Sequence, residues 1–299
     1  MKKVKKRIDT KTSRTAEMTC LTRASSYYSK TDQYKSADYI APKLLPGFIL
    51  PVVKLSKFRI IQNLFKNVFS PKGIYEYVIA RTKFIDSVFK NAVLNKFNQI
   101  LIFGAGFDTR GIRFLNENTA TKVFELDVPI TQQAKINQFQ KRKIKLHPDI
   151  IFIPINFNKE SITEKLNEFG FKKNLKTLFL LEGLLMYLDK KAVNNTFKLI
   201  NEFAGSGSEV IFDYIYKSVL RGENLYYGEK GIYKIVKKAK EAWTFGIEKG
   251  EINNFLKKQK LKLIQHLTSK DLEQKFFKNN KGKIIGRINE THCIVHAAR

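Results

Sequence analysis

Between residues 99 and 215 the chain alternates between short apolar runs and longer stretches with helical spacing, and this alternation restricts the fold most strongly. The apolar runs are expected to be buried strands, over 99–103, 122–127, 150–155, 177–181 and 209–214. Helices are predicted between them over about 130–144, 158–169 and 190–203, the second of them with Asn158 as its N-cap. Repeated strand–helix units with right-handed crossovers give a doubly wound sheet.

The flanking segments complete this pattern. A helix is predicted over 74–94, because its apolar residues recur at helical spacing and Pro71 and Gly73 mark its start. The C-terminal part predicts, in order, helices near 229–241 and 248–259, a strand over 262–267, a helix near 271–277 and a closing strand over 289–298. No helix follows the closing strand. We therefore expect an α/β fold with a doubly wound, seven-stranded, Rossmann-like sheet whose last strand runs antiparallel.

Composition limits the class of protein. A hydrophobic content of 43% with 12% aromatic residues excludes a disordered chain. There is no run of about 20 apolar residues that would span a membrane, and no apolar core follows the basic N-terminus as in a signal peptide. Only Cys20 and Cys293 are present, at opposite ends, which fits a soluble protein of the reducing cytoplasm.

The formal net charge of +28 has two interpretations. Clustered cations would indicate a nucleic-acid partner, because binding releases counterions. Here lysine occurs in nearly every segment together with abundant Asn, Ile and Phe, as expected of A/T-rich codons. The second interpretation is favoured, so nucleic acid is not the expected partner.

Four predicted strands end in distinctive residues, and these ends meet at one edge of a doubly wound sheet, where ligands bind. Gly104-Ala105-Gly106 follows the first strand, and this turn lets the backbone approach a ligand and point amides at it. The other ends are Glu125 with Asp127, Asn156-Phe157 and Glu182-Gly183. A carboxylate there can accept hydrogen bonds from both hydroxyls of a ribose, and an aromatic ring can pack against an adenine.

The glycine turn by itself is compatible with several ligands, or with a tight strand–helix turn that binds none. A nicotinamide dinucleotide site requires a third glycine three residues after the second, where this chain has Thr109. Several carboxylates near one ligand also favour a cation, such as a sulfonium, over a pyrophosphate. These observations argue against a hydride-transfer enzyme.

Three motifs in order along the chain carry a specific resemblance. They are Gly-Ala-Gly-Phe-Asp-Thr-Arg at 104–110, Phe-Glu-Leu-Asp-Val-Pro at 124–129 and Leu-Glu-Gly-Leu-Leu-Met-Tyr-Leu at 181–188. Together with shorter matches near Arg23, Arg81 and Trp243, they resemble the leucine carboxyl methyltransferase family, including its bacterial branch of class I S-adenosylmethionine-dependent O-methyltransferases. The likeness covers almost the whole chain.

The resemblance implies S-adenosylmethionine as the cofactor and assigns residues to it. Arg81 would hold its carboxylate, Gly104 and the turn that continues through Ala105 and Gly106 would line its methionine part, and Asp127 would bind the ribose. Glu182 would face the amino group or the sulfonium, and Arg23 would cover the site from an N-terminal lid.

Asn156 and Phe157 would frame the adenine. The family usually has Asp-Leu where this chain has Asn156-Phe157. An asparagine can still accept a hydrogen bond from the adenine amino group through its carbonyl oxygen.

The resemblance also predicts which part of the chain has which role. Residues 1–73 would form the helical lid, and residues 74–299 the methyltransferase domain, with an acceptor-side insertion over 215–247. Our own hypothesis is that Tyr187, Tyr214 and Trp243 shape the acceptor pocket, although Trp243 could equally belong to the core. The acceptor would be a small molecule or a peptide, and neither the oligomeric state nor a catalytic residue follows from the sequence.

The reaction expected is O-methylation of a carboxylate or a hydroxyl. A carboxylate acceptor is already ionised at neutral pH and needs no general base, and no histidine is expected at the strand ends. One alternative is an RNA methyltransferase, although Glu182-Gly183-Leu184-Leu185 replaces the Asn/Asp-Pro-Pro-aromatic motif usual in enzymes that methylate base amines. The other is a catalytically inactive protein that binds S-adenosylmethionine.

A metal site is not expected. His292-Cys293-x-x-His296 has suitable donors, but on a strand the two histidines point to one face and the cysteine to the other.

Overall fold

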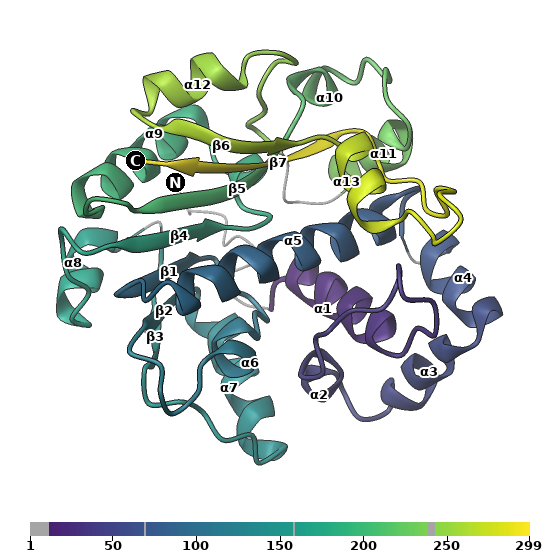
Figure 1. Cartoon of the computed structure of the whole chain (residues 1–299), viewed down its shortest axis with the longest axis horizontal. Helices are drawn as coiled ribbons and strands as arrows, with labels where there is room; N and C mark the ends of the chain where they lie inside the picture. The colour runs from purple at the N-terminus through teal and green to yellow at the C-terminus, as the bar shows by residue number, and fades with distance from the viewer. Residues whose placement is uncertain (1–11, 69, 158, 239–242) are drawn as a thin grey trace, which may run out of the picture.

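The computed structural model describes residues 12–68, 70–157, 159–238 and 243–299, and it confirms the doubly wound sheet (Figure 1). Seven strands in the described part form one sheet of order β3-β2-β1-β4-β5-β7-β6. They are β1 (Gln99–Phe103), β2 (Lys122–Asp127), β3 (Ile150–Pro154), β4 (Thr177–Leu181), β5 (Glu209–Ile215), β6 (Lys262–Leu267) and β7 (His292–Ala298). As predicted, β7 is antiparallel, and it pairs in that sense with both β5 and β6.

The helices fall into an N-terminal group and a group interleaved with the strands. The first comprises α1 (Arg14–Tyr27), α2 (Ala41–Leu44), α3 (Leu50–Lys54), a 3-10 turn (Leu55–Lys57) and α4 (Arg59–Asn67). The second comprises α5 (Ile74–Leu94), α6 (Arg110–Phe114), α7 (Pro129–Lys141), α8 (Ile162–Glu168), a 3-10 turn (Leu185–Tyr187), α9 (Lys190–Phe203), α10 (Lys217–Arg221), α11 (Glu229–Lys238), α12 (Ile252–Lys258) and α13 (Ser269–Phe276).

Two element boundaries differ from the prediction for identifiable reasons. Helix α8 begins at Ile162 because Ser161, whose hydroxyl accepts from the Glu164 amide at 3.3 Å, is its N-cap. The predicted cap, Asn158, lies outside the described residues. Strand β7 begins three residues later than predicted because the Asn289 amide donates to the Gly73 carbonyl at 3.0 Å, which anchors this residue to the start of α5.

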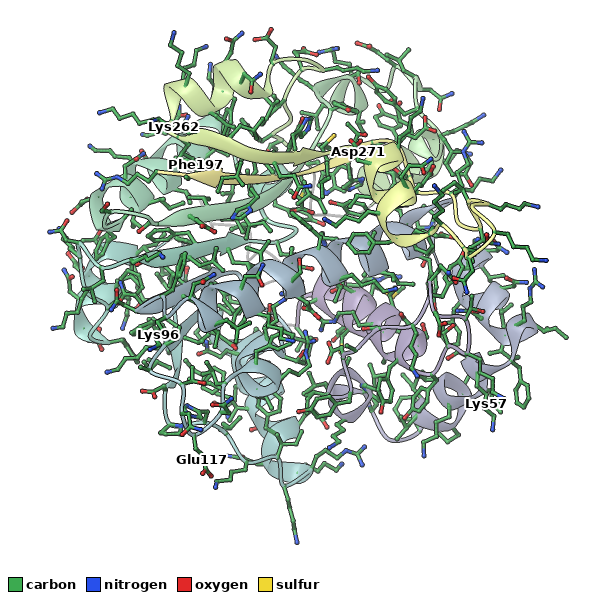
Figure 2. The ribbon with its side chains drawn as sticks, in the orientation of Figure 1. Lys57, Lys96, Glu117, Phe197, Lys262 and Asp271 are labelled. Atoms are coloured by element: carbon green, nitrogen blue, oxygen red, sulfur yellow. The ribbon has the colours of Figure 1, made fainter. Side chains whose placement is uncertain are left out.

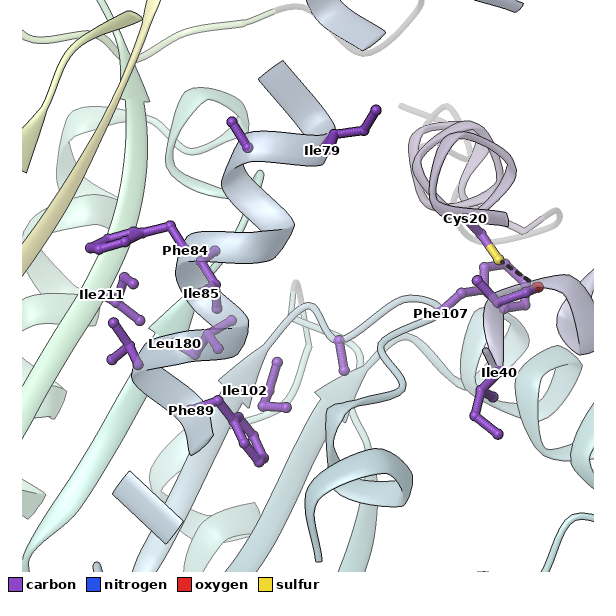
Figure 3. Close-up of a cluster of buried hydrophobic side chains, with 14 of the residues drawn as sticks. Cys20, Ile40, Ile79, Phe84, Ile85, Phe89, Ile102, Phe107, Leu180 and Ile211 are labelled. Atoms are coloured by element: carbon purple, nitrogen blue, oxygen red, sulfur yellow. Dashed lines mark hydrogen bonds between the residues drawn. The ribbon is translucent and has the colours of Figure 1, made fainter. Parts of the chain in front are cut away.

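Both faces of the sheet are covered, so successive strand residues enter two separate cores. Ile100 and Ile102 of β1 join a cluster with α5, α13 and the N-terminal helices, whereas Leu101 and Phe103 join one with α8, α9 and α12. This alternation follows from the two-residue period of a strand. On the first face Phe84, Ile85 and Phe89 of α5 point toward Ile102, Leu180 and Ile211 of the sheet (Figure 3).

The N-terminal helices dock on α5 through buried polar contacts as well as apolar ones. The Ser25 hydroxyl lies 3.0 Å from the Tyr75 hydroxyl of α5, and the Cys20 thiol contacts the Ala41 carbonyl at 3.6 Å (Figure 3). Both contacts are buried; the first holds α1 against α5, and the second holds α2 against α1. None of the helices in the described ranges combines the length and apolar character needed to cross a bilayer.

We predict that Phe197→Ala lowers the free energy of unfolding by about 3–5 kcal/mol, as is usual for a large aromatic truncated in a packed core. Phe197 is fully buried and packs edge-on against Phe212 and Phe255 at centroid distances of 5.5 and 5.3 Å. The measurement is urea unfolding followed by circular dichroism. Leu94→Ala is the control because Leu94 is 67% exposed. An equal loss in both variants would contradict the assignment of this core.

Candidate active site

A cleft of about 1020 Å³ opens at the carboxyl ends of β1 to β4, at the point where the strand order reverses. This is the place where doubly wound sheets bind ligands. Helix α1 and helix α9 contribute to its walls. Nine predicted residues line it, namely Arg23, Arg81, Gly104, Ala105, Gly106, Asp127, Asn156, Phe157 and Glu182.

The glycine turn after β1 is shaped by a close approach of the lid. Gly104 and Gly106 have φ of 62° and 52°, in the left-handed region that favours glycine. A Cβ on Gly106 would lie 2.9 Å from the Cβ of Ala16 on α1, so a larger residue would displace the lid.

The amides of this turn are used inside the protein, which corrects one expectation. The Ala105 amide donates to the Leu126 carbonyl at 2.9 Å, and the Gly106 amide donates to the Asp127 carboxylate. They are therefore not aimed at a ligand. The turn offers open backbone rather than an anion-binding set of amides, which agrees with the absence of a dinucleotide fingerprint.

Asp127 ends β2 with its carboxylate buried in the cleft wall. It accepts from the Val128 amide at 2.6 Å as well as from Gly106, and a carboxylate has lone pairs for two further donors. Burial raises the pKa of Asp127, and the two amides oppose that shift. Glu125 on the same strand instead pairs with Lys135, and burial raises its pKa to about 7 despite that lysine.

Glu182 ends β4 between two guanidinium groups. Its carboxylate lies 3.0 Å from Nε of Arg81 and 2.8 Å from Nη1 of Arg110. Burial disfavours the ionised form, but Arg110, Arg81 and Arg23 outweigh it and lower the pKa of Glu182 from 4.5 to about 2. The group is therefore ionised at neutral pH.

Asp213 of β5 holds the other side of Arg81. Its carboxylate accepts from Arg81 Nη1 at 2.6 Å, from the Tyr77 hydroxyl at 2.9 Å and from the Gly183 amide at 2.6 Å. Asp213 thus fixes both the guanidinium and the loop after Glu182. Sequence reasoning missed this residue, although an acid inside an otherwise apolar strand was a usable signal.

The ion pairs continue from Arg110 to the lid. Arg110 Nε contacts Asp86 at 2.8 Å, and Arg113 bridges Asp86 at 2.6 Å and Asp38 at 3.5 Å. Asp38 in turn lies 3.3 Å from Arg23 of α1. We name the whole set the buried ion network; it consists of Arg23, Arg81, Arg110, Arg113, Asp38, Asp86, Asp108, Glu182 and Asp213. Its five carboxylates outnumber its four guanidiniums, so it carries a formal negative charge beside the cleft.

The N-terminal end of α1 is attached on both sides of the cleft. The Ser13 amide donates to the Thr131 hydroxyl of α7 at 3.2 Å, and the Thr15 and Tyr187 hydroxyls lie 3.2 Å apart. Arg23 of α1 donates to the Phe107 carbonyl at 2.6 Å.

The three residues expected in the acceptor pocket have different positions. Tyr187 lines the cleft, and Trp243 packs edge-on against it at 6.3 Å without being a lining residue. Tyr214 does not line the cleft, which corrects the expectation. It follows Asp213 on β5, so its side chain enters the opposite core, where its hydroxyl lies 3.0 Å from Nε2 of His266. Thr244 lines the cleft instead, bonded to the Leu188 carbonyl at 2.8 Å.

The histidines of β7 are engaged individually. Nδ1 of His292 lies 2.7 Å from the Thr291 hydroxyl, and Nε2 of His296 lies 2.7 Å from Glu209. Cys293 packs into the core on the other face of the sheet. Within the part of the chain that the structure describes, no three His, Cys, Asp or Glu side chains form a group able to hold a metal.

The strand order, the antiparallel β7 and the acidic strand ends define a class I S-adenosylmethionine-dependent methyltransferase. More specifically, the chain belongs to the leucine carboxyl methyltransferase family, whose model matches residues 17–201. YktD of Bacillus subtilis (strain 168) is named as an S-adenosyl-L-methionine-dependent methyltransferase, and it is 27% identical to this chain over 221 residues. The matched region covers 74% of this chain and 72% of that protein. A protein of Mycobacteroides abscessus with the same assignment is 32% identical over 135 residues, which is 44% of this chain and 43% of that one.

Two solved structures share the fold. A DUF574 family protein from Streptomyces avermitilis has a TM-score of 0.54 at 12% identity, covering 98% of this chain and 99% of that chain. A crystal structure from Thermobifida fusca, assigned by name to the methyltransferases, has a TM-score of 0.50 at 10% identity, covering 82% and 90%. At these identities the likeness shows the fold alone.

The cleft fits S-adenosylmethionine, the cofactor of this family. The glycine turn exposes backbone without a Cβ, and the excess of buried carboxylates suits a ligand with a sulfonium and an ammonium group. The side chain of Phe157, 40% exposed at the end of β3, presents an apolar ring to the cleft. At about 1020 Å³ the cleft lies at the upper end of the roughly 300–1,000 Å³ of ligand pockets, so it is large enough for a cofactor of this size.

We predict that Glu182→Gln lowers the free energy of unfolding at pH 7 by about 3 kcal/mol, because it leaves two buried guanidiniums short of a partner. The depressed pKa means that the carboxylate stabilises the fold fully above pH 4.5 and loses this effect as pH falls toward about 2. The stability difference between wild type and variant should therefore shrink over that range, as measured by urea unfolding at a series of pH values.

Glu168→Gln is the matched control. Glu168 is 59% exposed and pairs only at the surface with Lys165, so its loss should change stability by less than about 1 kcal/mol. A Glu182→Gln effect that is equally small, or that does not depend on pH between 4.5 and 2, would be inconsistent with the ion pairs described.

Proposed function

We propose that this methyltransferase transfers the methyl group to an oxygen of a small molecule or peptide, and that the preferred acceptor is a carboxylate. The observation that carries the proposal is the composition of the cleft. Among the described residues that line it there is no histidine. Each acidic lining residue already has a partner: a cation for Asp108, Glu182 and Glu202, and a backbone amide for Asp127 and Asp189. A hydroxyl acceptor would need a base to remove its proton, whereas a carboxylate would not. The family to which the chain belongs is named for carboxyl methylation, and this supports the choice.

The cleft residues divide the binding of the cofactor among the strand ends. We assign the ribose hydroxyls to Asp127, the adenine to Asn156 and Phe157, and the amino group or sulfonium to Glu182. The methionine part would lie along the turn from Gly104 to Gly106, and its carboxylate would be held by Arg81, with Arg23 covering the site from the lid. The buried position of Arg81, fixed by Glu182 and Asp213, keeps its guanidinium in one orientation.

When bound, the cofactor supplies a methyl group on a positively charged sulfur, open to in-line attack. The protein's own contribution is alignment and exclusion of water. The N-terminal end of α1 contacts Thr131 and Tyr187, and from this position the lid would limit the access of solvent to the cleft. Tyr187, supported from behind by Trp243, would orient the acceptor. The formal net charge of +28 favours the approach of an anionic acceptor.

This proposal also assigns the parts of the chain. Residues 1–73 act as the lid and residues 74–299 as the catalytic domain. The 215–247 insertion serves the acceptor side, since Thr244 from this segment lines the cleft.

We expect Asp127→Ala to weaken binding of S-adenosylmethionine at least about tenfold, since it removes an acceptor of two charge-assisted hydrogen bonds. Isothermal titration calorimetry measures the affinity, and circular dichroism checks that the glycine turn and the sheet remain folded. Glu202→Gln is the control, because Glu202 also lines the cleft, on α9, but is assigned no contact with the cofactor. If the folded Asp127→Ala protein binds as tightly as wild type, the ribose assignment is wrong.

A second test concerns the acceptor atom. Cell extract is incubated with the protein and S-adenosylmethionine carrying a labelled methyl group, and the products are treated with mild base. A methyl ester releases volatile labelled methanol, whereas a methyl ether or a methylamine retains the label. We expect the label to be released as methanol. With the Tyr187→Ala variant we expect no labelled methanol if this residue orients the acceptor. Label retained after base would refute carboxylate methylation.

A further inference from the structure

The outer surface of the N-terminal helices is unusually apolar. Eight of the thirteen exposed large hydrophobic residues in the described chain fall between residues 39 and 68, so they are concentrated rather than scattered. We call them the outer face; they are Tyr39, Phe48, Val52, Leu55, Phe58, Ile60, Leu64 and Val68. Phe48 and Ile60 are 81% and 82% exposed. Exposed apolar groups gathered in one place mark an interaction surface more often than isolated ones do.

The exposure follows from how the helices are anchored. Gln62 and Phe65 of α4 point inward and are buried, which leaves Ile60, Leu64 and Val68, spaced by four residues, on the side facing solvent. Helix α3 is arranged in the same way, with Val53 buried and Val52 half exposed. Figure 1 shows α3 and α4 at the edge of the molecule, beyond α1 as viewed from the sheet.

The outer face carries positive charge and no negative charge. The sequence has no Asp or Glu between Asp38 and Glu76, whereas it has six cations there, namely Lys43, Lys54, Lys57, Arg59, Lys66 and Lys72. Five of them are exposed, whereas Lys66 is partly exposed and pairs with the buried carboxylate of Glu76. Lys57 projects from the outer edge of the molecule, with its ammonium 5.1 Å from the centre of the Phe58 ring (Figure 2). Cations and large apolar side chains are therefore both exposed on this segment of the chain.

We propose that the outer face binds the surface of a membrane that contains anionic lipid, with its apolar side chains inserted among the headgroups. Apolar side chains ringed by lysine and arginine are the chemistry by which interfacial helices hold such a surface. A second copy of the chain is a poorer partner, because symmetric pairing would bring two acid-free cationic surfaces together. A nucleic acid would satisfy the cations but would leave Phe48 and Ile60 exposed to water.

The outer face is connected to α1 and the residues just after it, and α1 lines the cleft. The Ser56 hydroxyl donates to the Ser25 carbonyl of α1 at 2.8 Å, and the Gln62 amide group donates to the Ser29 hydroxyl at 2.8 Å. Membrane binding would therefore hold the helix that covers the cleft. The proposal does not depend on which acceptor is methylated, since it concerns a separate surface.

The test is sedimentation of the full chain with phosphatidylcholine vesicles, with and without about 30% phosphatidylserine. We expect binding only to the anionic vesicles, weakened by added salt. Ile60→Ser with Leu64→Ser should reduce binding roughly tenfold or more, and Lys54→Gln with Lys57→Gln about 25-fold. Matched controls on other surfaces are Leu94→Ser with Ile264→Ser and Lys257→Gln with Lys258→Gln, which remove the same kinds of exposed side chain and should leave binding unchanged.

Binding of S-adenosylmethionine, measured by calorimetry, establishes that each variant is folded. Because it does not involve a methyl acceptor, the outcome of the vesicle test is independent of the acceptor proposed above. The proposal is overturned if wild type ignores anionic vesicles, or if the control variants lose binding as much as the outer-face variants. Dimerisation abolished by the Ile60/Leu64 variant, without vesicle binding, would assign the face to a second copy. RNA binding lost in the Lys54/Lys57 variant but kept in the Ile60/Leu64 variant, again without vesicle binding, would assign it to nucleic acid.

Discussion

The buried ion network is the interaction on which the rest of the structure depends. Charges buried in a protein are costly unless each is paired, and breaking one buried pair typically costs about 3–5 kcal/mol. Here Arg23, Arg81 and Arg110 reach carboxylates on other segments, so α1, α5, α6, β4 and β5 can satisfy their charges only when they come together. The lid, the central helix and the strand ends therefore assemble as one unit around the cleft.

This arrangement also prepares the site before a ligand arrives. Glu182 is held by an arginine of α5 and an arginine of α6. Asp127 is held by the Val128 amide, which follows its own strand, and by the Gly106 amide of the glycine turn. Neither carboxylate has to be ordered by the ligand, which reduces the entropy cost of binding. In the proposed function, the formal negative charge of the network would provide a fixed field for a cationic sulfur. Such a site would work by alignment more than by proton transfer.

Much of the framework was predictable because it depends on local patterns. The bounds of α5 and of strands β1, β2 and β4 agree with the sequence periodicity, since these elements are buried and their apolar spacing is unambiguous. Asp127 and Glu182 were placed at the cleft because the carboxyl ends of parallel strands meet at one edge. Tyr214 was misplaced because its exact register on β5 decides which core it enters, and Asp213, its neighbour, took the position beside the cleft.

The sequence by itself determined the class of fold, the family and the strand ends that form the cleft, because strand alternation and short motifs are properties of neighbouring residues. Only the tertiary structure decided which charges pair, since Arg81 and Asp213, or Asp86 and Arg110, are far apart in the chain and meet through packing. It also decided that the amides after β1 are occupied and that the apolar residues near Ile60 face solvent. The pairing of charges and the exposure of apolar side chains depend on which distant residues pack against them. A local sequence pattern contains no information about those residues.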